Sequence, residues 1–295
     1  MQALIDKFLD YIILEKGLSK STASSYASDL KKFKTFLETK NIEVFNKVTK
    51  KDIIDFLLAE KNKRLTESSI AREFVTIRVF FKFLSQEKFI TNNPTEFMDS
   101  PKLWKVLPSM LSESEVDLLL SSPQGNKPTM VRDKALLELM YATGLRVSEI
   151  CNIKVEDLHF DAGYLNCIGK GNKERIVPFS ENTANILKNY IINIRPLFCK
   201  NNNERTLFLS QLGKPINRKT VWKNIKKYAK DCRITKNISP HTLRHAFASH
   251  LLSHGAPLRI IQELLGHSDI STTQIYTHTD QNRLISIHRK YHPRA

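Results

Sequence analysis

The chain has 295 residues, with 46 lysines and arginines against 30 aspartates and glutamates and a formal net charge of +16. This length can bury a sizeable core and predicts two domains. The positive charge suits a polyanionic partner, although ribosomal, membrane-surface and nucleic-acid proteins all share it. The four cysteines are scattered without a CxxC pair, which is typical of thiols in a reducing compartment. With no signal-peptide pattern and no apolar run of membrane-spanning length, we expect a soluble cytoplasmic protein.

The apolar spacing of residues 1–95 predicts a first domain of four helices packed as a compact bundle. Ser19 or Ser21 is expected to cap the second helix, because a hydroxyl oxygen accepts from the free amides of a helix start. Thr49 with Asp52 is expected to open the third helix. The lysines of this bundle face either solvent or DNA, and their spacing does not distinguish the two.

The segment from residue 96 to residue 110 is expected to be a linker, because Pro101 and Pro108 interrupt it and it lacks apolar periodicity. Ser112 and Glu115 then form a capping-box pattern ahead of an apolar run. The second domain is therefore expected to cover residues 111–295.

Two short runs rich in Ile, Val and aromatic residues, Tyr164–Ile168 and Arg175–Phe179, predict the strands of a hairpin. The loop between them contains glycines and carries Lys170 at its tip. It lacks the spacing of a phosphate-binding GxxxxGK[ST] loop, so no ATP site is expected. Thr206–Ser210 is compatible with a third strand. The second domain is thus expected to be mostly helical with a small antiparallel sheet.

An apolar helix over residues 132–141 is expected to end in a glycine corner just before Arg146. Such a corner holds the guanidinium of Arg146 near a helix terminus. The corner alone does not distinguish a functional arginine from an ordinary surface arginine.

A helix beginning at Arg218 combines an apolar face with lysines distributed around the remainder. A run of like charges is usually just solvated. In a chain of charge +16, a helix with charges of one sign favours contacts with phosphate. We therefore predict four DNA-binding residues on this helix: Lys219, Lys223, Lys226 and Lys227.

Ser239 followed by Pro240 predicts a helix start, with the serine as cap and the proline at the first helical position. His241 and Arg244 are three residues apart, which places them about 60° apart on one face of this helix. The residues predicted to pack inward lie along a different line of the helix: Leu243, Phe247 and Leu251.

A second helix, Leu258 to Leu265, is expected to end at Gly266 in a left-handed conformation. His267 follows at once, and Tyr276 lies nine residues further on. Taken singly, a histidine or tyrosine is more often a packing or surface residue than a functional one. The HxxxH spacing of His241 and His245 lacks the glutamate of the zinc-protease pattern. The joint spacing of these residues, rather than any one of them, indicates a site.

Four segments together resemble the motifs of the tyrosine recombinases, also called the phage integrase family. They occur in the family's order and are Ala142–Glu149, Gly169–Arg175, His241–Phe247 and Leu264–Tyr276. The N-terminal bundle resembles the family's SAM-like core-binding domain. The length of the chain and its last four residues are most similar to the Xer recombinases. The fold that this resemblance implies is a C-shaped, two-domain DNA clamp.

The resemblance implies a reaction on a DNA phosphodiester, with six catalytic residues. Arg146 and Arg244 hold the nonbridging oxygens, because a guanidinium matches phosphate geometry and keeps its charge. Tyr276 is the nucleophile that forms a 3′-phosphotyrosine. The three remaining roles are those of His241 as general base, His267 as a hydrogen-bond donor to the phosphate and Lys170 as the acid for the leaving 5′-oxygen. No metal and no cofactor are expected.

The role implied by the resemblance is site-specific recombination that resolves chromosome dimers at cell division. The implied partners are a double-stranded DNA recombination site, a XerC-like recombinase in a heterotetramer and an FtsK-type DNA translocase. A phage or mobile-element integrase of the same family is the alternative enzyme. A non-catalytic DNA-binding protein on this scaffold is the alternative of another class, although a pure binder has no need of the Tyr276 phenol.

The C-terminal tail after Tyr276 shows a narrow apolar stripe over residues 283–288. We expect this stripe to be too small to bury itself well on its own domain. The tail is therefore predicted to dock on a neighbouring protomer.

Overall fold

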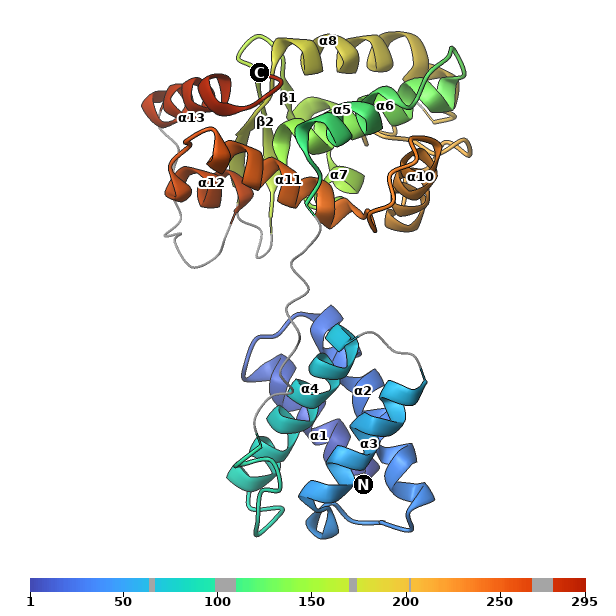
Figure 1. Cartoon of the computed structure of the whole chain (residues 1–295), viewed down its shortest axis with the longest axis vertical. Coiled ribbons are helices and arrows are strands. Elements are labelled where there is room, and N and C mark those ends of the chain that lie inside the picture. The colour runs from blue at the N-terminus through green and yellow to red at the C-terminus, as the bar shows by residue number, and fades with distance from the viewer. Residues whose placement is uncertain (64–66, 99–109, 170–173, 202, 267–277) are drawn as a thin grey trace. The chain divides into compact units, whose positions relative to one another are not determined.

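The computed structural model describes residues 1–63, 67–98, 110–169, 174–201, 203–266 and 278–295. The chain divides into two compact units, Met1–Val106 and Leu107–Ala295 (Figure 1). Most of the predicted linker, residues 96–110, lies outside the described residues.

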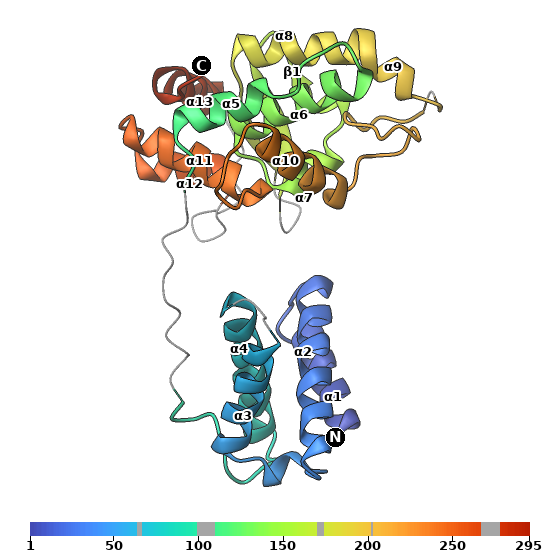
Figure 2. The same ribbon diagram turned by 45° about the vertical axis from the view of Figure 1, so that its right-hand side comes forward.

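Unit 1 is a bundle of four α-helices that lie side by side (Figure 2), as the apolar spacing predicts. Ser19 caps the second helix by accepting from the Thr22 amide, and Thr49 and Asp52 form the predicted capping box of the third. Buried phenylalanine rings in edge contact fill the space between the helices. The helices are α1 (Gln2–Leu14), α2 (Lys20–Thr39), α3 (Lys50–Asn62) and α4 (Glu67–Gln86), with a 3₁₀ turn, η1 (Phe45–Lys47), before α3.

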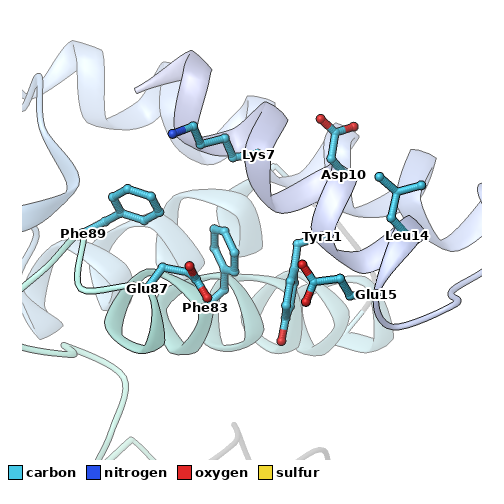
Figure 3. A pocket seen from close by; sticks show the side chains of 8 residues that line it. All are labelled: Lys7, Asp10, Tyr11, Leu14, Glu15, Phe83, Glu87 and Phe89. Carbon is cyan, nitrogen blue, oxygen red and sulfur yellow. The ribbon is translucent and has the colours of Figure 1, made fainter.

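A shallow hollow opens on unit 1 between α1 and the end of α4 (Figure 3). Three carboxylates, one lysine and apolar or aromatic side chains line it: Lys7, Asp10, Tyr11, Leu14, Glu15, Phe83, Glu87 and Phe89. The Lys7 ammonium lies over the Phe89 ring, 5.2 Å from its centre. This excess of carboxylates makes the hollow unsuitable for a phosphate.

Unit 2 packs helices around a small antiparallel sheet, and most residues of its helix α6 are buried. Ser112 and Glu115 form the predicted capping box at the start of its first helix. The α-helices are α5 (Glu113–Ser121), α6 (Pro128–Thr143), α7 (Val147–Asn152), α8 (Glu181–Asn189), α9 (Arg195–Phe198), α10 (Arg218–Asp231), α11 (Pro240–Ser253), α12 (Leu258–Leu265) and α13 (His278–Tyr291). A 3₁₀ turn, η2 (Val155–Asp157), and a π-helical stretch, η3 (Tyr190–Ile194), complete the helical elements of the described residues.

The sheet has the order β1-β2-β3, with β1 (Leu158–His159), β2 (Tyr164–Ile168) and β3 (Glu174–Pro178). Cys167 pairs with Arg175 in the β2–β3 register. The expected hairpin and the mainly helical fold class are confirmed.

The prediction of a third strand over Thr206–Ser210 is wrong. Residues 207–209 are all fully buried, whereas a strand with one covered face would alternate. The segment forms isolated bridges instead, Thr206 with Lys154 and Leu209 with Pro215. Side chains take two of its carbonyls, because Tyr190 donates to Leu207 and Arg195 donates to Thr206. The third strand is β1, whose two residues are too few to give a readable pattern.

The C-terminal helix α13 packs on its own unit, on the same side as α12 (Figure 1), so the expectation that the tail cannot bury itself is wrong. Leu284 and His288 are 2% and 1% exposed. The His288 Nε2–H donates to the Ala142 carbonyl at the end of α6 over 2.8 Å. The His288 and His292 rings stack with their centres 4.6 Å apart. Histidines supply the burial that the narrow apolar stripe does not.

We predict that His288 makes unit 2 less stable as the pH falls. Burial lowers the pKa of His288 to about 4, whereas the unfolded chain takes up this proton near the ordinary pKa of about 6.5. Below that pH the unfolded state binds the extra proton, so between pH 7.5 and pH 5 the folded state loses about 2 kcal/mol. His288→Gln keeps a donor for Ala142 but does not titrate.

Urea unfolding at several pH values measures this difference between wild type and His288→Gln. The exposed His245, changed to Gln, is the control for replacing a histidine outside this packing. A flat difference for His288→Gln would contradict the depressed pKa.

Candidate active site

The corner between α6 and α7 holds Arg146 at the start of a helix, as the sequence predicts. Gly144 ends α6 with φ of 58°, a left-handed conformation that glycine adopts without strain. A Cβ on this glycine would lie 2.4 Å from Cδ1 of Phe247 on α11. The corner therefore packs directly against α11, the helix that carries Arg244.

Helix α11 begins as predicted, with Ser239 as cap and Pro240 in the first turn. Leu243, Phe247 and Leu251 point into the core and are fully buried. Arg244 is 9% exposed and donates to the Gly144 carbonyl over 2.7 Å and to the Leu265 carbonyl over 2.5 Å. His241, in the first turn of the same helix, is exposed. The two predicted residues thus share a helix but differ in accessibility.

Glu149 on α7 lies where three arginines meet. Its carboxylate accepts from Arg146 Nη1 over 3.0 Å and from the Arg146 backbone amide over 2.8 Å. Arg175 on β3 donates to both of its oxygens, over 3.0 and 2.8 Å. Arg244 Nη1 lies 4.0 Å from Oε2. We call these four residues the arginine–glutamate cluster.

The end of α12 joins the same cluster through three successive carbonyls. Leu264 accepts from Arg175 Nε over 2.9 Å, Leu265 accepts from Arg244, and Gly266 accepts from Arg146 Nη2 over 3.3 Å. The last carbonyls of a helix lack helical partners and form the negative end of its dipole, so arginines suit them. Gly266 adopts the predicted left-handed conformation, with φ of 66°. The chain is therefore fixed directly before His267.

The cluster is built to receive an anion. Three guanidinium groups against one carboxylate leave a charge of 3 − 1 = +2. Burial, followed by the neighbouring Arg146 charge, lowers the pKa of Arg244 to about 10, so it stays protonated at neutral pH. Burial acts to raise the pKa of Glu149, but hydrogen bonds from Arg175 and Arg146 outweigh it and keep this pKa below its usual range. The Arg146 side chain is 34% exposed and forms the accessible side of the cluster.

Three predicted catalytic residues, Lys170, His267 and Tyr276, lie outside the described residues. Sequence reasoning missed Glu149 and Arg175 as parts of the site. Their signal was a charged residue in an otherwise apolar setting: arginine opens the run Arg-Ile-Val-Pro-Phe at 175–179, and glutamate follows the glycine corner. Within the described part of the chain, no three histidine, cysteine or acidic side chains are placed to hold a metal ion.

Helix α10 exposes all four predicted DNA-binding lysines, Lys219, Lys223, Lys226 and Lys227. At about 100° per residue, the first three lie within about 60° of one another around the helix, together with Lys230. Trp222 on the same helix is 46% exposed, and the Lys226 ammonium lies over its ring, 4.3 Å from the ring centre. The helix thus presents a basic stripe beside an aromatic ring.

Two family models match the chain. Residues 109–283 match the phage integrase family, and residues 5–88 match the phage integrase N-terminal SAM-like domain. The chain therefore belongs to the phage integrase family of tyrosine recombinases. The prediction of an enzyme that cuts and rejoins DNA is confirmed with it.

Among curated relatives, the chain is similar to tyrosine recombinase XerD of Staphylococcus saprophyticus, with 44% identity over 295 residues and both chains fully covered. It is 42% identical over 292 residues to tyrosine recombinase XerD of Halalkalibacterium halodurans, covering 99% of this chain and 98% of that one. The expectation of a Xer-type recombinase is confirmed by these matches.

Two solved structures share the fold. XerH recombinase bound to a palindromic difH substrate matches with a TM-score of 0.71 and 22% identity, over 90% of this chain and 78% of that one. A lambda integrase dimer bound to a COC′ core site matches with a TM-score of 0.72 and 20% identity, over 94% and 98%.

We predict that Gly144→Ala destabilises unit 2 by about 2–5 kcal/mol. A left-handed alanine costs about 1–2 kcal/mol, and the contact with Phe247 adds about 1–3 kcal/mol of overpacking. Gly163→Ala is the matched control, because φ there is 73° but the nearest atom to a Cβ is 3.6 Å away. It should lose only the conformational part. Equal losses of unfolding free energy in urea would show that Phe247 moves aside without destabilising the fold.

Proposed function

We propose that this chain is a site-specific recombinase that cleaves double-stranded DNA through a 3′-phosphotyrosine at Tyr276 and rejoins it. The observation that carries the proposal is the arginine–glutamate cluster, where Arg146 and Arg244 are fixed beside each other with an excess of positive charge. The similarity to XerD recombinases over the whole chain supports it.

The chemistry explains why two fixed arginines are needed. A phosphodiester resists attack because its anionic oxygens repel a nucleophile. Donors already fixed in place stabilise the charge that develops on those oxygens, without reorganising during the reaction. Arg146 is held by Glu149 and the Gly266 carbonyl, and Arg244 by the Gly144 and Leu265 carbonyls, so their positions are set before DNA arrives. We assign both to the nonbridging oxygens.

The remaining steps use the other predicted residues. The Tyr276 oxygen attacks phosphorus, and His241 accepts its proton, because a phenol with a pKa of about 10 is mostly protonated at neutral pH. The bond from phosphorus to the 5′-oxygen breaks, and Lys170 supplies the proton to that oxygen. His267 donates a hydrogen bond to the phosphate. The phosphotyrosine keeps the bond energy, so rejoining needs no nucleotide.

The biological role that we propose is the resolution of chromosome dimers at cell division, in the cytoplasm. The XerD names of full-length relatives support it. A XerC-like recombinase in a heterotetramer and an FtsK-type translocase are the proposed partners. No helix in the described ranges is both long and apolar enough to cross a membrane. A phage or mobile-element integrase would instead act on attachment sites, so the DNA that the protein recombines distinguishes the two.

We predict that Tyr276 forms a covalent bond to DNA. A DNA site nicked near the cleavage point loses its short 5′-hydroxyl fragment, so the protein–DNA adduct should accumulate without metal or ATP. Tyr276→Phe lacks only the hydroxyl and should bind DNA normally without forming an adduct. Arg146→Ala and Arg244→Ala should slow adduct formation by about a hundredfold or more, because the developing charge loses a fixed donor.

The adduct is measured by denaturing electrophoresis and located by mass spectrometry. Specific binding of the DNA, with a XerC-like partner present, is shown first. An adduct formed equally well by Tyr276→Phe would refute the assignment. No adduct in a specific, synapsed complex would favour the non-catalytic alternative.

We predict that α10 contributes phosphate contacts. Each phosphate contact adds about 0.9 to the slope of log affinity against log salt, so Lys219→Gln with Lys223→Gln should make that slope shallower by about 2. The exposed lysines of α8 and α13, as Lys188→Gln with Lys290→Gln, serve as the control. Binding titrations from low to high salt measure the slopes. Equal slopes in both double variants would place DNA elsewhere.

A further inference from the structure

Arg175 is the one arginine of the cluster that the proposed reaction does not use. It is 5% exposed and is the second residue of β3, the strand that follows the hairpin loop carrying Lys170. Its guanidinium donates to both oxygens of Glu149, and its Nε–H donates to the Leu264 carbonyl. All three of its guanidinium nitrogens donate to these acceptors, so we give it no role as a phosphate ligand. Because it donates to both oxygens of Glu149, Arg175 is placed to affect the site by controlling what else that carboxylate can bind.

Arg175 and Arg244 approach the same carboxylate oxygen. Arg175 Nη2 lies 2.8 Å from Glu149 Oε2, and Arg244 Nη1 lies 4.0 Å from it. A buried carboxylate that loses a hydrogen-bonded partner bears a large desolvation cost and takes the nearest available donor. Without Arg175, Glu149 keeps its hydrogen bonds from Arg146, and the nearest further cation is Arg244, about 1 Å beyond hydrogen-bond distance.

We propose that Arg175 is a positioning residue that saturates Glu149 and thereby keeps Arg244 on the backbone carbonyls of Gly144 and Leu265, available to the DNA phosphate. The inference rests on the proposed function of Arg244. We assign Arg175 no contact with the reacting atoms. It sets the direction in which a neighbouring guanidinium is held.

The charges around Glu149 give this role a pH signature. The groups that face the carboxylate are Arg146 from its own helix, Arg175 from β3, Arg244 from α11 and the Cys167 thiol from β2. Burial raises the pKa of Cys167 to about 12, so the thiol stays neutral. The hydrogen bonds of Arg175 lower the pKa of Glu149, and their removal raises it. Protonated Glu149 no longer attracts Arg244, so a variant lacking Arg175 should recover as the pH falls.

The test compares Arg175→Gln, Glu149→Gln and the double variant in single-turnover formation of the DNA adduct, at saturating nicked DNA. We expect Arg175→Gln to slow cleavage by about a hundredfold and Glu149→Gln by about tenfold, with the double variant no slower than Glu149→Gln alone. The rate of Arg175→Gln relative to wild type should rise as the pH is lowered. If the losses multiply in the double variant, Arg175 acts on the phosphate or the fold and not through Glu149.

Arg132→Gln is the matched control for a purely structural loss. Arg132 is 4% exposed, donates twice to Oδ1 of Asp133 and once to the Leu209 carbonyl, so it too pairs with a buried carboxylate and a backbone carbonyl of unit 2. Arg132→Gln should lower the melting temperature. Its cleavage rate relative to wild type should not rise as the pH is lowered, and adding Glu149→Gln should not restore that rate. The same behaviour from Arg175→Gln would overturn the proposal. If Arg175→Gln does not fold, Arg175→Lys replaces it, because an ammonium can satisfy one carboxylate oxygen but not both.

A readout independent of activity separates this inference from the proposed function. In a crystal structure of the Arg175 variant, the distance from Arg244 Nη1 to Glu149 Oε2 should fall from 4.0 Å to about 3 Å. An unchanged distance would refute the inference even if the wild-type protein cleaves DNA. A shortened distance would support it even if no adduct forms, in which case only the proposed function fails.

Discussion

The buried carboxylate of Glu149 is the constraint on which the site depends. A charge that is 5% exposed must be paired, because a lone buried ion costs several kcal/mol. Its partners come from the α6–α7 corner, from β3 and, at 4.0 Å, from α11. Segments that are distant in sequence are thereby brought to one point. The last carbonyls of α12 accept from the same arginines, so the end of this helix, directly before His267, is fixed relative to Arg146 and Arg244.

Unit 1 uses buried carboxylates differently, and the contrast explains the special character of the cluster. Asp29 and Glu73 are buried there, but their partners Arg72 and Lys32 have side chains that are 45% and 40% exposed. The side chains of those cations are partly in solvent, and each forms an ion pair with a carboxylate on another helix. In unit 2, Arg175 and Arg244 are themselves buried around Glu149, so a surplus of positive charge is held at low dielectric, where it acts more strongly on a phosphate.

Much of the fold could be predicted because its signals are local. A serine before a proline fixes the start of α11, and glycines fix the ends of α6 and α12 through backbone conformation alone. The spacing of His241 and Arg244 is likewise a property of one helix. Tertiary packing decided what the sequence did not predict. Residues 207–209 are fully buried, with the Tyr190 hydroxyl on the Leu207 carbonyl, and the tail is buried by histidines such as His288, whose partner carbonyl lies on α6. The pairing of Arg175 with Glu149 across the fold has no short-range signal.

Arginine suits these positions because each side chain must donate hydrogen bonds to several acceptors that lie in different directions. Arg146 bonds Glu149 and the Gly266 carbonyl while 34% of its side chain remains accessible, and Arg244 bonds two carbonyls from different helices. A guanidinium has five N–H donors in a rigid plane, so it can be held by the protein on one edge and meet a phosphate on another. A lysine places all its donors on one nitrogen and cannot span two carbonyls and a ligand in fixed directions. The stability of the site and its affinity for an anion are thus carried by the same planar groups, which couples the packing of α12 to the chemistry beside it.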